Sequence, residues 1–473
     1  MLLVATAARL WHLDSYLHFA NDEARDARVV MAMLEELDPV LVGPSASIGN
    51  FSLGPLFYYL EAPFFFVLDG DPLAGGLLAA LVGIATVALL FRVGRRLFGR
   101  VGGSVAATLL ATGFIAVLHS RWGWNPNLLP FFVLTFLYGI WLLMVRTTVR
   151  ETGRVGTGLE LAVFGLAAAT QLHATAFALV VPFLVVLIWS KPRMYVSEVF
   201  ISVLIGVGLY LPVWLKDAAD GWKMLGGAYD WAVGLLFGEG TRGLGMRIVI
   251  RGEELLRLLS ELLFARSSVW LGALLLCVVF GVLFAHLFQK ARRMQRFLSR
   301  LLLVTLLAQM LPLLFLQERL YMHYVLQTLP VLLLVIALGV QRVWGLQAHP
   351  AVLSVGIAVP MMALSSFHVL EMWNYWSALD QGTWEGAYAV PLQDLEAVSE
   401  VITSKPNESR VLLDVSYQDE RFEDALVYLL ERRGLQPELV VDDGEEPQWI
   451  VERWSGVRGE RYGRLGLVEH TNR

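Results

Sequence analysis

Long apolar segments recur throughout this chain of 473 residues, and many of them run for about 17–25 residues. A helix needs about 20 apolar residues to cross the hydrocarbon core of a bilayer. Hydrophobic residues make up 56% of the chain and charged residues 17%, against about 25% charged residues in soluble domains. These features exclude a soluble protein, a nucleic-acid-binding protein, a coiled coil and a disordered chain. Solid apolar blocks also argue against a porin-type barrel, whose strands alternate.

The apolar segments predict a polytopic α-helical membrane protein with about eleven spans. The first is too short, because at 1.5 Å per residue its apolar stretch covers about half of a bilayer core. It also lacks the basic start of a signal peptide, so either the chain begins upstream or this helix is half inserted. The expected spans are 2–13, 72–91, 101–118, 128–145, 158–171, 174–190, 196–213, 268–288, 301–316, 325–341 and 351–369.

The short loops differ in charge, and basic residues mark the cytoplasmic side of a membrane. One set holds fifteen of them: Arg92, Arg95, Arg96, Arg100, Arg146, Arg150, Arg154, Lys191, Arg193, Lys290, Arg292, Arg293, Arg296, Arg300 and Arg342. The opposite short loops hold only Arg121 and Arg319. This asymmetry predicts an inner (plasma) membrane protein with a cytoplasmic N-terminus. A single kinked helix over 158–190 is the alternative to two spans there, but it would break this alternation.

The C-terminal part has a different composition. Residues 371–473 hold 21 acidic and 10 basic residues, a net charge of −11, whereas residues 1–370 carry +6. We expect a membrane domain over 1–370 and a small extracytoplasmic, water-soluble α/β domain over 371–473. Its expected helices are 391–403 and 419–433, and its expected strands 410–415, 438–442 and 448–452. The single cysteine, Cys277, is expected to be a small buried apolar residue.

The first outer segment, 14–71, is large, and residues 21–36 within it predict a short amphipathic helix on the outer membrane face. Asn21 is its expected N-cap, and Asp22 and Glu23 lie in its first turn. The two acids have two interpretations. They can simply complement the helix dipole, which is common. Alternatively, a carboxylate at the water–lipid boundary can take a proton from an attacking hydroxyl.

Glycine and proline then interrupt the chain between Gly43 and Pro63, which indicates irregular backbone. Tyr58 and Tyr59 lie in this stretch. They are either interfacial aromatic anchors or contacts to a headgroup or sugar ring.

Further polar residues fall at the expected outer ends of spans, where they could bind an anionic lipid group: His119, Arg121, His173, Arg319, His323 and Tyr324. The two arginines suit a phosphate best, because a guanidinium pairs with it bidentately. Alternatively, Arg121 is a snorkelling interfacial cation and the histidines are hydrogen-bonded packing residues.

The order of these features resembles bacterial membrane glycosyltransferases of the GT-C type, the family 39 and protein-mannosyltransferase-like group that includes the aminoarabinose transferases of lipid A. The resemblance spans roughly residues 9–345. It rests on Asp22-Glu23, the segment Gly54–Tyr59, the arginine-rich turn Arg92–Gly99, His119–Asn127, Gln171–His173 and Leu320–Val325 before Pro330.

The resemblance implies a polyprenyl-phosphate sugar donor, inversion at the anomeric centre and no catalytic metal. It assigns the general base to Asp22, with Glu23 beside it. Many relatives carry His-Pro-Pro where this chain has Leu53-Gly54-Pro55, so that histidine contact to the donor is missing.

We therefore expect an inverting glycosyltransferase that acts at the outer face of the inner membrane on a lipid, glycan or protein acceptor, without nucleic acid. No cofactor is predicted, and the sequence leaves a divalent metal open. A secondary transporter is one alternative, although its ionisable groups would lie at the membrane midplane. A polyprenyl-lipid-binding protein without catalysis is the other.

Overall fold

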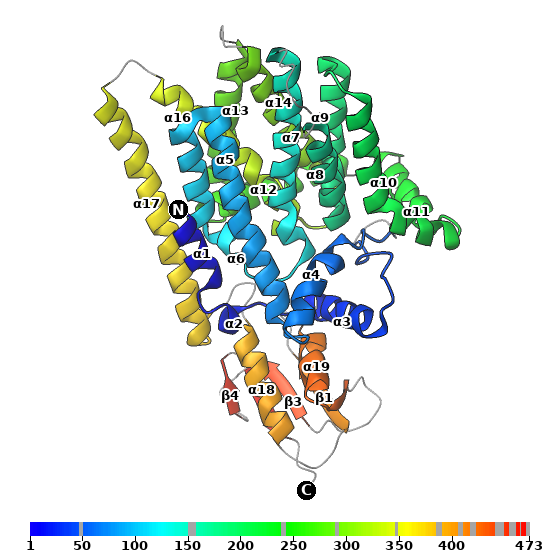
Figure 1. Ribbon diagram of the computed structural model, residues 1–473. Helices are drawn as coiled ribbons and strands as arrows, with labels where there is room; N and C mark the ends of the chain where they lie inside the picture. The colour runs from blue at the N-terminus through cyan, green and yellow to red at the C-terminus, as the bar shows by residue number, and fades with distance from the viewer. Residues whose placement is uncertain are drawn as a thin grey trace.

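The computed structural model describes residues 1–46, 51–149, 158–237, 243–288, 293–345, 349–384, 390–404, 410–416, 422–439, 449–453, 460–463 and 465–469. Figure 1 shows a bundle of helices with a small unit of helices and strands at one end. This confirms the predicted fold class. Six helices among the described residues are long and apolar enough to cross a membrane, and four apolar helices are shorter.

The membrane bundle begins with the short helix α1 (Leu2–Leu10), which has nine residues and agrees with the expected incomplete first span. The following short elements, α2 (Leu13–Tyr16), α3 (Asn21–Glu36) and α4 (Leu56–Val67), cover the part of the chain that the sequence predicted to be the first outer segment. The remaining helices are α5 (Leu73–Thr112), α6 (Phe114–Leu118), η1 (Asn125–Leu128), α7 (Leu129–Val149), α8 (Gly158–Leu172), η2 (Ala174–Leu179), α9 (Val180–Val185), η3 (Val186–Ser190), α10 (Val196–Ala219), α11 (Lys223–Phe237), α12 (Leu244–Phe264), α13 (Val269–Phe288), α14 (Arg293–Met310), η5 (Pro312–Phe315), α15 (Met322–Leu326), α16 (Leu329–Trp344) and α17 (Pro350–Asp380).

Helix α5 is a hairpin of two arms. Gly99 has φ +78° and ψ 175°, which is not helical and which a residue with a side chain rarely adopts. A Cβ on Gly94 would lie 2.9 Å from the Cα of Gly103. Nine residues of straight helix would separate these glycines by about 13 Å, so the chain reverses at Gly99. The two arms correspond to the two spans expected over 72–91 and 101–118.

The helix over residues 158–190 is broken, as the charge pattern indicated. His173 has an extended backbone, with φ −161° and ψ 141°, and separates α8 from the turn η2. The break places the polar side chain of His173 near the end of the bundle.

Helix α17 runs through residue 370 to Asp380, and only 6% of its most apolar 18-residue stretch is buried inside the protein.

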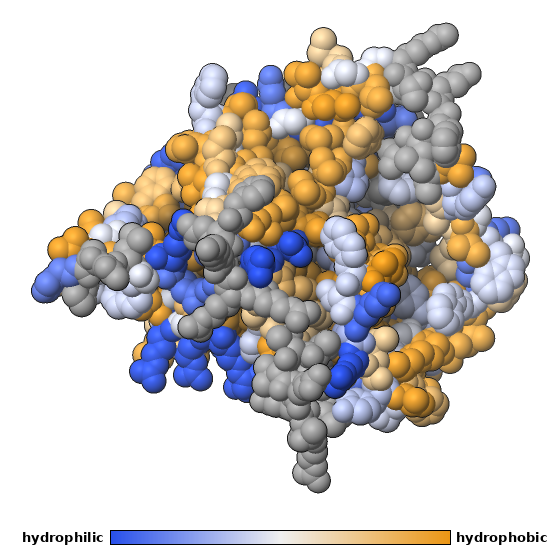
Figure 2. Space-filling model, turned by 90° about the horizontal axis from the view of Figure 1, so that it is seen from above, coloured by the Kyte–Doolittle hydropathy of each residue, from blue (hydrophilic) through white to orange (hydrophobic). Residues whose placement is uncertain are grey.

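The expectation that Cys277 is buried was wrong, because the cysteine is exposed on α13. A surface that faces lipid accepts apolar residues, so an apolar segment does not imply burial in the protein. In Figure 2, which looks down on the molecule from above, hydrophobic residues cover much of the surface and hydrophilic residues gather in patches.

The C-terminal unit contains α18 (Leu392–Ser404), α19 (Glu423–Arg432) and a five-stranded sheet. Its strands are β1 (Arg410–Ser416), β2 (Gln436–Leu439), β3 (Trp449–Arg453), β4 (Glu460–Tyr462) and β5 (Leu465–Glu469), in the order β2-β1-β3-β5-β4. Strand β1 pairs in parallel with β2 and β3, and β5 pairs antiparallel with β3 and β4. The sheet confirms the expected α/β unit. The expected start of the second helix at 419 and the end of the second strand at 442 lie outside the described residues.

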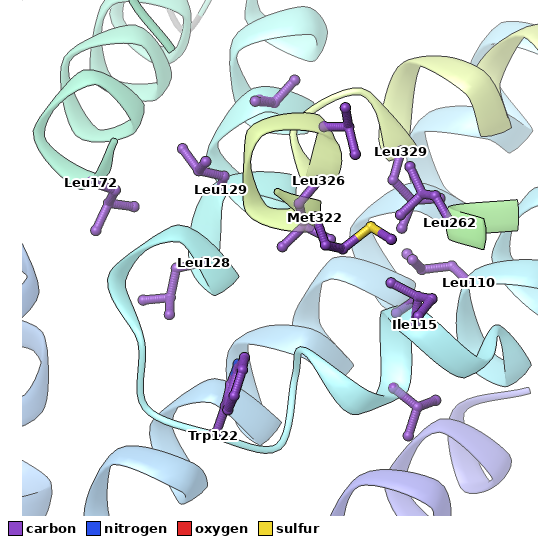
Figure 3. Close-up of a cluster of buried hydrophobic side chains, with 14 of the residues drawn as sticks. Leu110, Ile115, Trp122, Leu128, Leu129, Leu172, Leu262, Met322, Leu326 and Leu329 are labelled. Carbon is purple, nitrogen blue, oxygen red and sulfur yellow. The ribbon is translucent and has the colours of Figure 1, made fainter. Parts of the chain in front are cut away.

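A buried apolar cluster underlies the end of the bundle that faces this unit. Figure 3 shows it between the ends of several helices, with Met322 and Leu326 of α15 among its members. It contains Leu110, Ile115, Trp122, Leu128, Leu129, Leu172, Leu262, Met322, Leu326 and Leu329. The cluster fixes the short segments that carry His119, His173, His323 and Tyr324.

Candidate active site

Helix α3 forms where the sequence predicted it, but its N-terminus is built differently. Ala20 is the N-cap and Asn21 is the first helical residue. The carboxylate of Glu23 accepts a hydrogen bond from the backbone N–H of Ala20 at 2.9 Å. The expectation that Asn21 caps this helix was therefore wrong. A glutamate at the third position can reach back over the first turn, and this frees the side chain of Asn21 for another partner.

A cavity of about 520 Å³ opens beside the first turn of α3. Its wall is mostly apolar, and Asp22 and Arg25 are the acidic and basic side chains that line it. Segments far apart in the sequence meet here, from Pro44–Ala46 in the first outer segment to α11, α14 and α15. The lining residues are Asp22, Arg25, Pro44, Ser45, Ala46, Phe51, Leu53, Trp124, Asn125, Pro126, His173, Ala174, Thr175, Phe177, Ala178, Ala228, Trp231, Gln309, Pro312, Leu313, Leu316, His323 and Tyr324.

Arg25 joins two acids of the same helix. One guanidinium nitrogen lies 2.8 Å from the carboxylate of Asp22, and the other groups bind Asp26 at 2.8 and 2.9 Å. The side chain of Asp22 is 50% exposed, whereas that of Asp26 is buried. Burial raises the pKa of Asp26 to about 6, against the opposing charge of Arg25. Two nitrogens of the Arg25 guanidinium thus bind the buried Asp26, and the third binds Asp22, which lines the cavity together with Arg25.

Glu23 is buried, binds the backbone N–H of Ala20 and is not among the residues that line the cavity. Burial raises the pKa of its carboxyl from the ordinary value of 4.5 to about 8, with the nearby charge of Asp22 acting in the same direction. A carboxyl in this environment holds its proton near neutral pH. The structure therefore separates the two adjacent acids that the sequence grouped together.

An aromatic group lines another side of the cavity. The ring centroid of His323 lies 4.7 Å from that of Trp124, 5.2 Å from that of His173 and 4.4 Å from that of Tyr324. Burial lowers the pKa of His173 to about 4, and burial next to His173 lowers that of His323 well below its ordinary value. Both imidazoles are therefore neutral near pH 7, where they can hydrogen-bond to a hydroxyl-rich ligand.

Arg121 and His119 are not brought to this cavity. The guanidinium of Arg121 donates to the backbone oxygens of Ala8, Arg9 and His12, each at 3.1 Å, and lies over the ring of Trp376. These oxygens lie at the C-terminal end of α1, where a cation is favourable. His119 is buried, and its Nδ1 lies 2.9 Å from Oδ1 of Asn127.

Three further predicted residues lie outside the lining. The hydroxyl of Tyr58 donates to the buried carboxylate of Asp26 at 3.2 Å, so it contacts the Arg25–Asp26 pair rather than the cavity lining. Tyr59 is partly exposed and donates to the backbone oxygen of Val40 at 2.9 Å. Arg319 is exposed in the segment before α15.

Arg25 is the charged residue of the cavity lining that the sequence analysis missed. Its signal was present, because Asp22 and Arg25 are three residues apart and neighbours on a helix surface. No group of three or more His, Cys, Asp or Glu side chains arranged to hold a metal ion occurs among the described residues.

The predicted resemblance is confirmed by comparison with known proteins. A family model described as dolichyl-phosphate-mannose-protein mannosyltransferase matches residues 52–215. No curated protein matches the sequence. The structure of ArnT from Cupriavidus metallidurans bound to undecaprenyl phosphate is similar, with 12% sequence identity and a TM-score of 0.58 over 98% of this chain and 96% of ArnT.

The oligosaccharyltransferase AglB from Archaeoglobus fulgidus shares the fold as well. Its complex with zinc and sulfate has 12% identity and a TM-score of 0.57, over 92% of this chain and 61% of AglB. A second AglB structure contains an inhibitory peptide and a dolichol-phosphate, with a TM-score of 0.53. This chain spans less than two thirds of the length of AglB. It has the fold of the GT-C glycosyltransferases and is a multi-pass membrane protein.

Proposed function

We propose that this protein is an inverting glycosyltransferase that moves a sugar from a polyprenyl-phosphate donor to an acceptor hydroxyl at the outer membrane face. In this proposal residues 1–370 carry the reaction, and residues 371–473 form the extracytoplasmic unit. The observation that carries the proposal is the cavity beside α3, where one partly exposed carboxylate and one guanidinium meet an otherwise mostly apolar wall.

Each lining feature has a place in the reaction. Asp22 takes the proton of the acceptor hydroxyl while its oxygen attacks the anomeric carbon. The bond between this carbon and the phosphate oxygen breaks, its electron pair stays on that oxygen, and polyprenyl phosphate leaves. Arg25 lies next to Asp22 and stabilises the charge that develops on the phosphate. Attack from the side opposite the leaving group inverts the anomeric centre.

The remaining residues of the cavity lining suit the isoprenoid chain and the sugar of such a donor. Phe177, Trp231 and Leu313 offer apolar surface to an isoprenoid chain near the phosphate. Trp124, His173, His323 and Tyr324 provide ring faces and neutral hydrogen-bonding groups for a sugar. The match to the mannosyltransferase family model and the shared fold support glycosyl transfer from a lipid-linked sugar.

The test is incubation of the purified protein with a panel of polyprenyl-phosphate sugars and detection of free polyprenyl phosphate. Asp22→Asn should abolish its release, because an amide cannot accept the proton, and should leave expression and membrane insertion intact. Glu36→Gln, at the exposed far end of the same helix, is the matched control and should behave as the wild type. Normal turnover by Asp22→Asn would remove Asp22 from the role of base.

Arg25 is tested separately on the same assay. Arg25→Lys keeps the positive charge but cannot bind Asp22 and Asp26 together, and Arg25→Ala removes the charge. We expect the donor KM to rise about tenfold in Arg25→Ala and less in Arg25→Lys. An unchanged donor KM in Arg25→Ala would show that the phosphate binds elsewhere.

A further inference from the structure

Asn21, the residue before Asp22, binds the C-terminal unit through both the nitrogen and the oxygen of its side-chain amide. The amide nitrogen of Asn21 donates to the carboxylate of Glu423 at 2.8 Å, and its amide oxygen accepts from the backbone N–H of Asp424 at 2.9 Å. Both partners lie in the first turn of α19, whose own N-cap residue, Phe422, makes no side-chain capping hydrogen bond. Asn21 therefore caps a helix that lies some 400 residues further along the chain.

A second anchor lies two turns further along α3. The guanidinium of Arg28 binds the carboxylate of Glu431 at 3.0 Å and the backbone oxygen of Asp424 at 3.1 Å. It also lies 5.9 Å from the ring centroid of Tyr428. Seven residues are almost two helical turns, so Asn21 and Arg28 project from one side of α3. Two anchors on one side fix both the position of this helix along α19 and its rotation about its own axis.

Helix α19 is itself tied to the membrane bundle. The hydroxyl of Tyr428 donates to the backbone oxygen of Gly70 at 2.6 Å, and Arg432 donates to that of Asp69 at 2.9 Å. Both acceptors lie in the turn between α4 and α5. Helix α18 makes a further connection, because the backbone N–H of Leu392 donates to the backbone oxygen of Leu17 at 2.8 Å, shortly before α3 begins. The C-terminal unit thus connects α3 to the bundle along a path separate from the chain itself.

We propose that the C-terminal unit is a clamp that orients α3, and that Asn21 and Arg28 are positioning residues for Asp22; this rests on the proposed function, in which Asp22 is the base. A carboxylate must lie within hydrogen-bonding distance of the acceptor hydroxyl, and a displacement of about 1 Å can cost a hundredfold in rate. The side chain of Asp22 is half exposed and packs little itself, so its position depends on the helix that carries it. The clamp acts on turnover more than on donor binding.

The test compares three variants of the full-length protein. Arg28→Glu reverses one anchor, Arg28→Glu with Glu431→Arg restores the pair with exchanged charges, and Arg433→Glu is the matched control. Arg433 pairs with Glu400 at 3.5 Å, between α19 and α18, and thus within the C-terminal unit. We expect kcat to fall about tenfold in Arg28→Glu with a donor KM within twofold of the wild type. The exchanged pair should recover at least half of kcat, and Arg433→Glu should stay within twofold.

A wild-type kcat in Arg28→Glu, or an equal loss in Arg433→Glu, would overturn the clamp. Backbone hydrogen exchange over residues 21–36 gives a readout that is independent of sugar transfer. We expect faster exchange there in Arg28→Glu than in Arg433→Glu, and equal exchange would also overturn the clamp. If the wild type transfers no sugar from any donor, the proposed function fails, and the exchange experiment still decides the clamp.

Discussion

The guanidinium of Arg121 donates its hydrogen bonds to backbone oxygens at the C-terminal end of α1 and just after it. Three backbone oxygens accept from it, and its side chain is only 3% exposed. The sequence predicted this arginine at the outer face but could not show that its partner would be a helix end 109 to 113 residues earlier in the chain. Hydrogen bonds to a charged group are each worth about 1.5–3 kcal/mol, so the residue matters for stability wherever the donor binds.

Arg121→Ala should therefore lower the stability of the protein by about 3 kcal/mol, because three backbone oxygens, one of them buried, lose a charged donor. The donor KM of the folded protein should stay unchanged, since the side chain does not line the cavity. Thermal unfolding in detergent and donor titration measure the two effects. A raised donor KM in a stable Arg121→Ala protein would show that Arg121 does bind the donor.

The raised pKa of Glu23 predicts a pH dependence of stability. The folded protein keeps this proton up to about pH 8, whereas the unfolded chain loses it near the ordinary pKa of 4.5. The contribution of Glu23 to the free energy of unfolding therefore decreases as the pH rises between these values. Glu23→Gln keeps an oxygen for the N–H of Ala20 and removes the titration.

We expect the Tm of Glu23→Gln, measured relative to the wild type, to increase by roughly 2–4 °C between pH 5 and pH 8.5. Parallel thermal unfolding curves at both pH values check this. A difference that does not change with pH would show that Glu23 is already ionised in the folded protein.

At the scale of elements, glycines set how closely α7 and α8 approach. A Cβ on Gly165 of α8 would lie 2.5 Å from the backbone nitrogen of Phe136 and 2.8 Å from the oxygen of Phe132. Membrane helices pack through small residues in this way, because close backbone contact replaces the hydrophobic effect. This contact supports α8, which ends directly before His173.

Gly165→Ala should destabilise the protein by about 1–3 kcal/mol, because the added methyl group forces the two backbones apart. Gly208→Ala in α10 is the matched control, since nothing lies within 4 Å of a Cβ there. Thermal unfolding of both variants measures the difference. Equal stability of the two would mean that α7 and α8 separate without cost.

The elements that the sequence predicted are those with a strong local pattern. Helix α3 shows an apolar stripe with acids in its first turn, and its bounds of Asn21–Glu36 match the expectation. Strands β4 and β5 were missed because β4 is short and polar and β5 contains a glycine, so neither forms a clear run of β-branched residues. The capping of α19 by Asn21 was also invisible, because it joins residues far apart in the chain.

On the scale of the whole molecule, charge separates its two ends. The basic loops and the acidic C-terminal unit predict a cytoplasmic and an extracytoplasmic side, and the cavity lies toward the end that carries the acidic unit. This sidedness follows from the distribution of basic residues, which sequence alone displays. The meeting of α3, α11, α14 and α15 around one cavity required the fold.

Cysteine labelling checks the orientation. In a Cys277→Ser background, a single cysteine at Glu400, which is 69% exposed, should react with a membrane-impermeant maleimide in right-side-out vesicles. A cysteine at the exposed Arg100 should react only in inside-out vesicles. The reverse pattern would invert the topology and place the cavity on the cytoplasmic side.

The reversal at Gly99 joins the two arms of α5 without a loop. Proteases cut most readily at exposed loop tips with free backbone, and this turn offers them almost none. Digestion from the side of the basic loops should therefore leave both arms on one uncut fragment, even where other connections on that side are cleaved.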